Sequence, residues 1–259
     1  MTGEPLLSAL ACGLAAAVGA MLLPRIIAAL PEPAPADPVS RPAEADASLA
    51  AGEEAVATAP PVGTKVLYVE LGTAPWLGAR LALAAGLVAA AMGASRGWQA
   101  DLPVWVFLAV LGVGLGYIDW RTRLLPSRLV APAYGVVGAL VGIAAATTWS
   151  SGGADRLLTA VVCWLVVFTA YFLLWFVYPR GLGYGDVRLS GVLGMALGYL
   201  GVGATVVGVY AGFLLGAVIG GVLALAGVVD RRGYPFGPFM LAGAFLGVLH
   251  ADGTLLFWR

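Results

Sequence analysis

The sequence predicts an all-α, polytopic membrane protein with about eight transmembrane helices. Of its 259 residues 61% are hydrophobic and only 11% are charged, and the mean hydropathy is +0.93. Because soluble domains carry roughly a quarter charged residues, the lipid bilayer is the expected solvent and partner of this chain. The formal net charge is zero, so the overall charge balance gives no indication of a nucleic-acid partner.

Apolar runs of spanning length recur along the chain. Crossing a hydrocarbon core of about 30 Å takes roughly 20 helical residues. The run at 187–229 is long enough for two helices, and the glycine-rich residues 200–203 are the expected turn between them. The runs lie at residues 5–27, 75–92, 103–118, 129–148, 157–178, 187–229 and 236–249.

The chain divides into three parts. Residues 1–30 are predicted to form the first transmembrane helix, which we expect to be retained because no basic region precedes its apolar core. Residues 31–74 are rich in Ala, Pro and acidic residues and have no sustained apolar period, which predicts a disordered cytoplasmic linker. Residues 75–259 are predicted to form a seven-helix membrane core.

The basic residues predict the orientation of the helices. Cytoplasmic loops close to membrane helices carry an excess of Lys and Arg. In an eight-helix arrangement only Arg96, Arg156 and Arg259 of the 14 basic residues fall on the opposite side. We therefore expect both termini to face outward, and the linker and the loops after the third, fifth and seventh helices to face the cytoplasm.

Two acidic residues are candidates for chemistry. The other Asp and Glu residues lie in the linker, near the termini or in short loops, whereas Asp119 ends the third predicted helix and Asp186 begins the sixth. Carboxylates at the membrane edge are costly and are functional candidates for that reason. The topology places both at the cytoplasmic edge. If they meet, one would hold a proton while the other stays ionised, which is the arrangement that activates water in an aspartyl protease.

Neither a metal nor a cofactor is expected. The two-aspartate mechanism needs neither, and the two cysteines, Cys12 and Cys163, lie in apolar runs without a second cysteine or histidine at ligand spacing.

Simpler structural roles exist for both aspartates. Asp186 follows a glycine and precedes an apolar run, which is typical of a helix N-cap. Asp119 could pair with Arg121 or Arg123 at the end of its helix.

The glycines before Asp186 have a physical interpretation of their own. Gly181, Gly183 and Gly185 can adopt positive φ and would let the backbone approach a substrate strand or the partner carboxylate closely. Bulkier residues at these positions would block that approach.

Three motifs carry a resemblance to a known family. The segment Gly183-Tyr184-Gly185-Asp186 matches the GxGD signature of intramembrane aspartyl peptidases. The segment that begins at Asp119 and ends in Arg-Leu-Leu-Pro resembles the other catalytic motif of the type IV prepilin peptidase family, and Pro235-Phe236-Gly237-Pro238 resembles the family's PFGP segment. The motifs stand in family order, and the resemblance covers about residues 105–249.

The resemblance implies a function. Asp119 and Asp186 would be the catalytic pair, and Gly183, Tyr184, Gly185, Pro235 and Gly237 would shape the cleft or bind substrate. Substrates and partners would be prepilin or pseudopilin precursors with a short basic cytoplasmic leader, which is cut after a glycine and before the hydrophobic helix. The location would be the inner (cytoplasmic) membrane, as a multi-pass protein with its active site on the cytoplasmic side.

The chain departs from the family pattern at two places. Many relatives carry CxxC motifs after the first helix and also methylate the new amino terminus, but residues 31–74 contain no cysteine, so N-methyltransferase activity is not expected. Ser127 stands where the family usually has Asn and keeps a hydrogen-bonding group.

Other functions fit parts of the sequence. A small proton- or cation-coupled transporter could use the same aspartates, and a non-catalytic scaffold of a pilus or secretion assembly would need neither. Presenilin-like and preflagellin peptidases share GxGD, whereas the PFGP segment before the last helix favours the prepilin type.

Overall fold

The computed structural model describes residues 4–31, 67–179, 181–226 and 235–253, and its regular structure over these residues is helical throughout. The all-α prediction is therefore confirmed. The helices are α1 (Glu4–Ala20), α2 (Leu23–Ala28), α3 (Tyr68–Gly72), α4 (Leu77–Arg96), α5 (Leu102–Thr122), α6 (Ser127–Thr147), the 3-10 turn η2 (Trp149–Ser151), α7 (Gly153–Val177), α8 (Tyr184–Leu200), α9 (Val202–Leu215), the π-helical turn η3 (Gly216–Gly220), α10 (Gly221–Leu225) and α11 (Gly237–Ala251).

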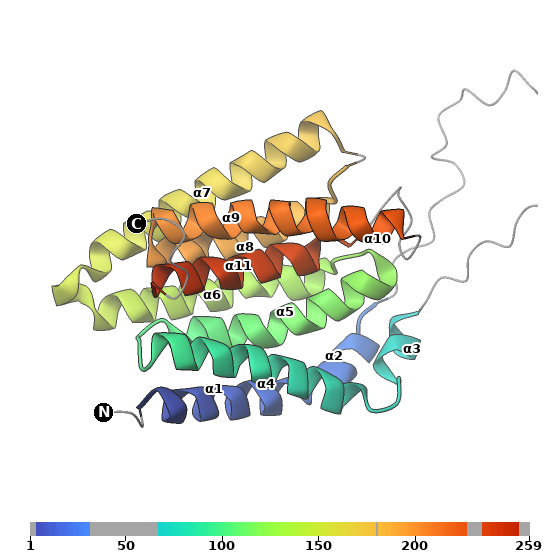
Figure 1. Ribbon diagram of the computed structural model, residues 1–259, viewed down its shortest axis with the longest axis horizontal. Coiled ribbons are helices and arrows are strands. Elements are labelled where there is room, and N and C mark those ends of the chain that lie inside the picture. The colour runs from blue at the N-terminus through green and yellow to red at the C-terminus, as the bar shows by residue number, and fades with distance from the viewer. Residues whose placement is uncertain (1–3, 32–66, 180, 227–234, 254–259) are drawn as a thin grey trace, which may run out of the picture.

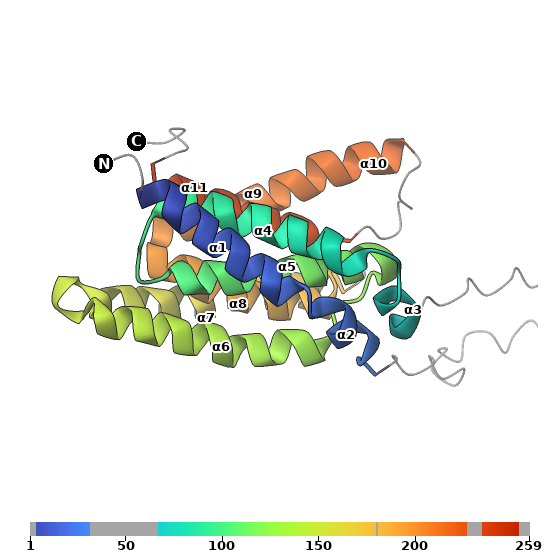
Figure 2. The ribbon, with the colours of Figure 1, turned by 90° about the horizontal axis from the view of Figure 1, so that it is seen from below.

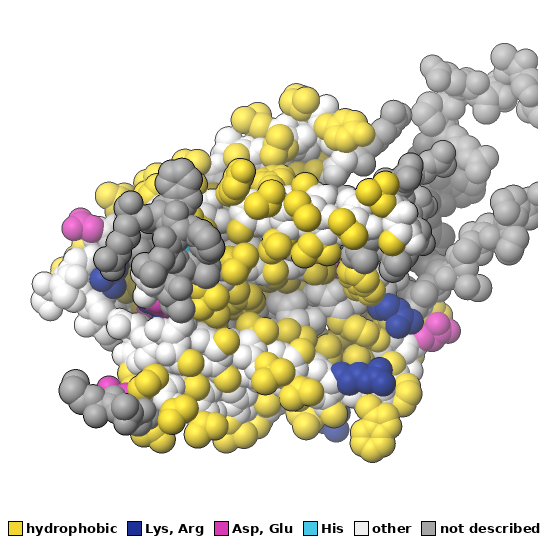
Figure 3. Space-filling view, in the orientation of Figure 1, with side chains coloured by type: hydrophobic (Ala, Val, Ile, Leu, Met, Phe, Trp, Pro, Cys, Tyr) yellow, Lys and Arg dark blue, Asp and Glu magenta, His cyan; other side chains and the backbone are white. Residues whose placement is uncertain are grey.

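The helices have the length and composition of membrane spans. Within the described residues, six helical stretches are long and apolar enough to cross a bilayer. Helices α8 and α11 are shorter, with 17 and 15 residues, and they fall where the sixth and eighth predicted spans lie. Apolar side chains cover the flank of the molecule, and the charged side chains gather at its two ends (Figure 3). The chain is thus a polytopic membrane protein with a span count close to the predicted eight.

Antiparallel helix pairs build the bundle. Helix α1 lies along α4, α7 along α8, and α9 along α11 (Figures 1 and 2). Helix α5 runs between these pairs and contacts α1, α4, α6 and α11. Its side chains belong to both apolar cores, one shared with α1 to α4 and one with α6 to α11.

The turn between α8 and α9 lies where the glycines predicted it. Helix α8 ends at Leu200 and α9 begins at Val202, with Gly201 between them at a φ of +125°. This backbone conformation is accessible to glycine and strained for residues with a side chain. The turn divides the long apolar run 187–229 into two antiparallel helices.

The predicted linker is shorter than expected at its C-terminal end. Residues 68–72 of the segment 31–74 form helix α3, which packs against α2. The side chains of Tyr68 and Leu71, three residues apart on one helical face, are buried. Residues 32–66 of the linker lie outside the described part of the chain, where the prediction of disorder stays a prediction.

Both ends of the described chain lie at one end of the bundle, and the motif residues lie at the other. Helix α1 begins and helix α11 ends at the same end of the bundle (Figures 1 and 2). The end of α5 and the beginnings of α8 and α11 lie at the opposite end. The described chain thus begins and ends at one end of the bundle, which agrees with an even number of crossings.

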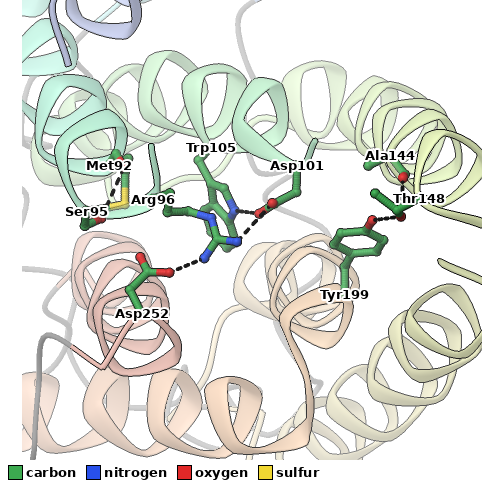
Figure 4. A network of polar contacts seen from close by, with 9 residues as sticks. All are labelled: Met92, Ser95, Arg96, Asp101, Trp105, Ala144, Thr148, Tyr199 and Asp252. Atoms are coloured by element: carbon green, nitrogen blue, oxygen red, sulfur yellow. Dashed lines mark hydrogen bonds and ion pairs between the residues drawn. The ribbon is translucent and has the colours of Figure 1, made fainter. Parts of the chain in front are cut away.

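A network of ion pairs and hydrogen bonds joins the helices at the end of the bundle where the described chain begins and ends. The guanidinium of Arg96, at the end of α4, donates to the carboxylates of Asp101 at 3.0 Å and Asp252 at 2.6 Å. Asp101 also accepts a hydrogen bond from the indole N–H of Trp105 at 2.8 Å (Figure 4). The network joins the α4–α5 loop to the end of α11.

Candidate active site

Asp119 lies in the last turns of α5 and is almost completely buried, with 4% of its surface exposed. Its Oδ2 accepts a hydrogen bond of 3.0 Å from the backbone N–H of Gly237, the first residue of α11. A side chain on Gly237 would begin only 2.9 Å from the same oxygen. The PFGP segment therefore packs its backbone directly against the first candidate aspartate.

Asp186 is the third residue of α8 and is 8% exposed. Gly183 is the N-cap residue of this helix, and its backbone N–H donates to Asp186 Oδ2 at 3.2 Å. The alternative that Asp186 is itself the N-cap is wrong by three positions. Its carboxylate nevertheless satisfies an amide that the first helical turn leaves unpaired.

The two aspartates belong to one electrostatic site. Asp119 lies close enough to Asp186 for their negative charges to repel each other. In a buried setting such repulsion disfavours the simultaneous ionisation of both groups. The arrangement can therefore hold one proton on the pair, with one carboxylic acid to donate and one carboxylate to accept.

Leu125, in the turn between α5 and α6, joins the three motifs. A Cβ on Gly185 would lie 2.7 Å from Leu125 Cβ, and a Cβ on Gly237 would lie 3.5 Å from Leu125 Cδ1. The same leucine thus packs against the GxGD segment and against the PFGP segment. It lies within the motif that begins at Asp119, but nothing in the sequence distinguished it from neighbouring leucines.

The glycines before Asp186 do not use positive φ. Gly183 has a φ of −73°, and neither Gly181 nor Gly185 is among the positive-φ glycines of the described chain. The conformation that these glycines permit is not used, because the chain enters α8 through an extended N-cap rather than a left-handed turn. The expected close approach does occur at Gly185, although the approaching group is Leu125 and not a carboxylate.

The predicted pairing of Asp119 with an arginine does not occur at Arg121 or Arg123. Neither forms an ion pair with it, and over the described ranges the ion pairs are those of Arg96. Arg123 instead contributes its backbone N–H, which donates to the carbonyl of Asp119 at 2.7 Å where α5 ends. Burial without a basic partner among the described residues is what distinguishes Asp119 from a simple interfacial aspartate.

Tyr184 is positioned at the rim of the site. Its ring is half exposed, lies 5.0 Å from the ring of Trp175 and is covered by the Arg188 guanidinium at 4.6 Å. Arg188 donates in turn to Ser127 Oγ, and its carbonyl accepts from Tyr134 Oη at 2.6 Å. Ser127, the position that departs from the family pattern, therefore anchors the arginine that covers Tyr184.

A second residue that the sequence did not single out is Tyr171 of α7. It is 2% exposed and lies within electrostatic range of Asp186. Its ring contacts Phe213 at 5.1 Å, and Phe213 contacts Phe236 at 5.3 Å. Pro235, which is buried, precedes Phe236, so this aromatic row connects α7 and α9 to the PFGP segment. A lone tyrosine in an apolar run gives no sequence signal of such a contact.

The fold and the paired buried carboxylates define a polytopic membrane protein with an acidic centre at one edge of its bundle. Residues 105–225, which contain both aspartates, match the model of the type IV leader peptidase family. The family resemblance predicted from the motifs is confirmed.

Characterised relatives agree with this assignment. A prepilin leader peptidase/N-methyltransferase of Aeromonas hydrophila is 28% identical over 176 residues, which cover 64% of this chain and 54% of the relative. A protein of the same name from Bacillus subtilis (strain 168) is 28% identical over 180 residues, 68% of each chain. The chain thus spans about half the length of the Aeromonas relative. No solved structure gave a significant match.

Proposed function

We propose that this protein is a membrane aspartic endopeptidase that removes the short cytoplasmic leader from prepilin or pseudopilin-like precursors. The observation that carries the proposal is that three motifs far apart in the sequence, the Asp119 motif, the GxGD segment and the PFGP segment, meet at one end of the bundle. There a buried Asp119, held by the Gly237 amide, interacts with a buried Asp186. The family match and the names of the relatives support the choice of prepilins as substrates.

The pair would activate water by general acid-base catalysis. The ionised aspartate accepts a proton from a water molecule as its oxygen attacks the scissile carbonyl carbon, while the protonated aspartate donates to the carbonyl oxygen. Collapse of the tetrahedral intermediate breaks the C–N bond, and the leaving amine takes a proton from the pair. The amides of Gly183 and Gly237 fix the orientation of both carboxyl groups during these steps.

The distribution of basic residues supports the side of the membrane that we propose for the site. We propose an inner (cytoplasmic) membrane location with the aspartate end in the cytoplasm, because the positive-inside rule assigns that end to the side with most arginines. A leader on the cytoplasmic side of a membrane-inserted precursor would then lie level with the two carboxyl groups. We propose the peptidase activity alone and not the methyltransferase activity that the relatives' names include.

The rival functions receive less support. A transporter should carry its acidic residues near the middle of the membrane, whereas Asp119 and Asp186 occupy terminal turns at one end of the bundle. A scaffold gives no reason to bury two carboxylates without a basic partner among the described residues.

Cleavage of a co-expressed prepilin tests the proposal. We expect the wild-type protein to convert the precursor to the shorter product, and Asp119→Asn and Asp186→Asn each to leave it uncut. Asp155→Asn, an exposed aspartate at the start of α7, is the matched control and should cut normally. Normal cutting by either active-site variant, at equal membrane levels, would refute the two-aspartate mechanism.

A further inference from the structure

An apolar groove of about 420 Å³ lies between α7 and α9. Figure 1 shows α7 running obliquely away from α9 toward the end that holds the aspartates. The groove is lined by one face of α7 between Val162 and Leu174 and by one face of α9 between Val202 and Phe213. Tyr171, Thr205 and Tyr210 are among the few lining side chains with polar atoms. Along α7 it extends over roughly 18 Å of helix.

The end of this groove that is lined by Tyr171 and Phe213 adjoins the candidate active site. Tyr171 and Phe213 line it, and Tyr171 lies within electrostatic range of Asp186. Tyr171 also lines a small cavity together with Ser190, one helical turn beyond Asp186 on α8. Phe213 contacts Phe236, the residue before Gly237. The groove therefore leads toward both carboxyl groups.

A larger groove elsewhere does not reach the site. Its volume is about 1010 Å³, and it lies between α1, α5 and α6 with Trp98 and Gln99 at its outer end. Along α5 it extends inward only to Val110, roughly 13 Å of helix before Asp119 at 1.5 Å per residue. Its size alone thus does not make it the substrate groove.

We propose that the groove between α7 and α9 holds the hydrophobic helix of the substrate, with the helix's amino-terminal end at Asp119 and Asp186. The inference rests on the proposed function and adds the place at which the precursor docks. Helices associate in membranes by close van der Waals packing against small or flat surfaces. Ala170 and Cys163 leave room between the two helices for one face of an incoming helix. A helix held there presents the bond before its first turn to the two carboxyl groups.

Photo-crosslinking with neighbouring positions of α7 tests the docking site. Val166 lines the groove and is 59% exposed, whereas Leu165, one residue earlier and 51% exposed, does not line it. A photo-reactive amino acid is placed at each position of the full-length protein in membranes, in an Asp119→Asn background that keeps the precursor uncut. We expect position 166 to capture a co-expressed prepilin about tenfold more than position 165. A probe at Ala15 reports on the larger groove.

Several outcomes would overturn the proposal. Equal capture at positions 165 and 166, preferential capture at position 15, or capture of phospholipid alone at position 166 would each show that the substrate helix docks elsewhere. If the wild-type protein cuts the same prepilin, any of these crosslinking results refutes the docking site but not the proposed peptidase function. If the wild-type protein cuts no prepilin, the docking site and the proposed function are both refuted.

A groove-filling substitution provides a second, independent readout. Ala170 lines the groove and is exposed, and its neighbour Thr169 is exposed but does not line it. Ala170→Trp should lower the cleavage rate about tenfold or more by occupying the helix's place, whereas Thr169→Trp should stay within about twofold of wild type. Equal rates for the two variants would contradict the proposal.

Discussion

At the scale of residues, the orientation of Asp119 depends on a backbone amide that lies 118 positions further along the chain. The sequence identifies Asp119 and Asp186 because buried carboxylates in an apolar chain are rare and costly. It does not reveal Leu125 and Tyr171, because their importance arises from contacts that only the assembled bundle creates. Nor does the sequence determine the backbone conformation at Gly183: a glycine permits positive φ but does not require it, and Gly183 has a φ of −73°.

Gly237→Ala should impair catalysis without unfolding the protein. The added methyl group would lie 2.9 Å from Asp119 Oδ2, so the carboxylate or α11 must shift. A displacement of the reacting group by a fraction of an ångström to about 1 Å can cost up to roughly a hundredfold, and we expect a loss of cleavage rate of about tenfold or more. The measurement is the rate of prepilin cleavage in membranes.

Gly142→Ala is the control for this substitution. Gly142 lies on α6 with open space around its Cβ position, and its variant should cut at the wild-type rate. If Gly237→Ala cuts as fast as Gly142→Ala, the PFGP amide does not position Asp119 as we describe.

At the scale of elements, α8, which carries Asp186, packs closely against α7. Gly194 and Gly198 let the backbones approach, since a Cβ on Gly198 would lie 2.6 Å from Cys163 Cβ. The sequence predicted the turn between α8 and α9 from its glycines. It missed α3, because five residues are too few to establish a helical period.

Gly198→Ala should destabilise the protein. The methyl group has no space beside Cys163 and Ala160, and overpacking of this kind costs about 1–3 kcal/mol. We expect a lower thermal unfolding midpoint in detergent micelles than for wild type. Gly135→Ala, on α6 with nothing near its Cβ position, should leave the midpoint almost unchanged. Equal midpoints for the two variants would show that α7 and α8 are not in the close contact described.

At the scale of the whole molecule, the ion-pair network of Arg96 and the two candidate aspartates lie at opposite ends of the bundle. The Arg96 network lies at the end where both termini lie, and the aspartate pair lies at the other end (Figures 1 and 4). Helix α11 connects the two, with Gly237 at its start and Asp252 just after its end. The hydropathy of the sequence predicts the membrane-spanning helices that place these two sites at opposite ends of the bundle. It does not predict the grooves, because they depend on the angles at which helices diverge.

Arg96→Ala should lower stability and leave the chemistry intact. The Arg96 side chain is 8% exposed, and its removal would leave the carboxylates of Asp101 and Asp252, whose side chains are 4% and 12% exposed, without their common partner. Breaking a buried ion pair costs about 3–5 kcal/mol. Unfolding in detergent should report that loss, while the cleavage rate per folded molecule stays within about twofold of wild type because the network is remote from the aspartates.

Arg156 provides the comparison for Arg96. It lies at the same end of the bundle, is exposed and contacts the Tyr199 ring at 6.0 Å. Arg156→Ala should cost no more than about 1 kcal/mol. Similar losses of stability in both variants would mean that the buried network does not hold α4, α5 and α11 together.

The central claim is that Asp119 and Asp186 act as one catalytic unit, and a double-mutant comparison of cleavage rates tests it most directly. The single-turnover rate for a purified prepilin is measured with Asp119→Asn, with Asp186→Asn and with both substitutions together. We predict that the cleavage rate of each single variant falls about 10³-fold or more and that the double variant is no slower than either. The reason is that removing one of two residues that act as a unit already abolishes the contribution of both. Losses that multiply in the double variant, or a single variant that keeps most of the wild-type rate, would contradict the account.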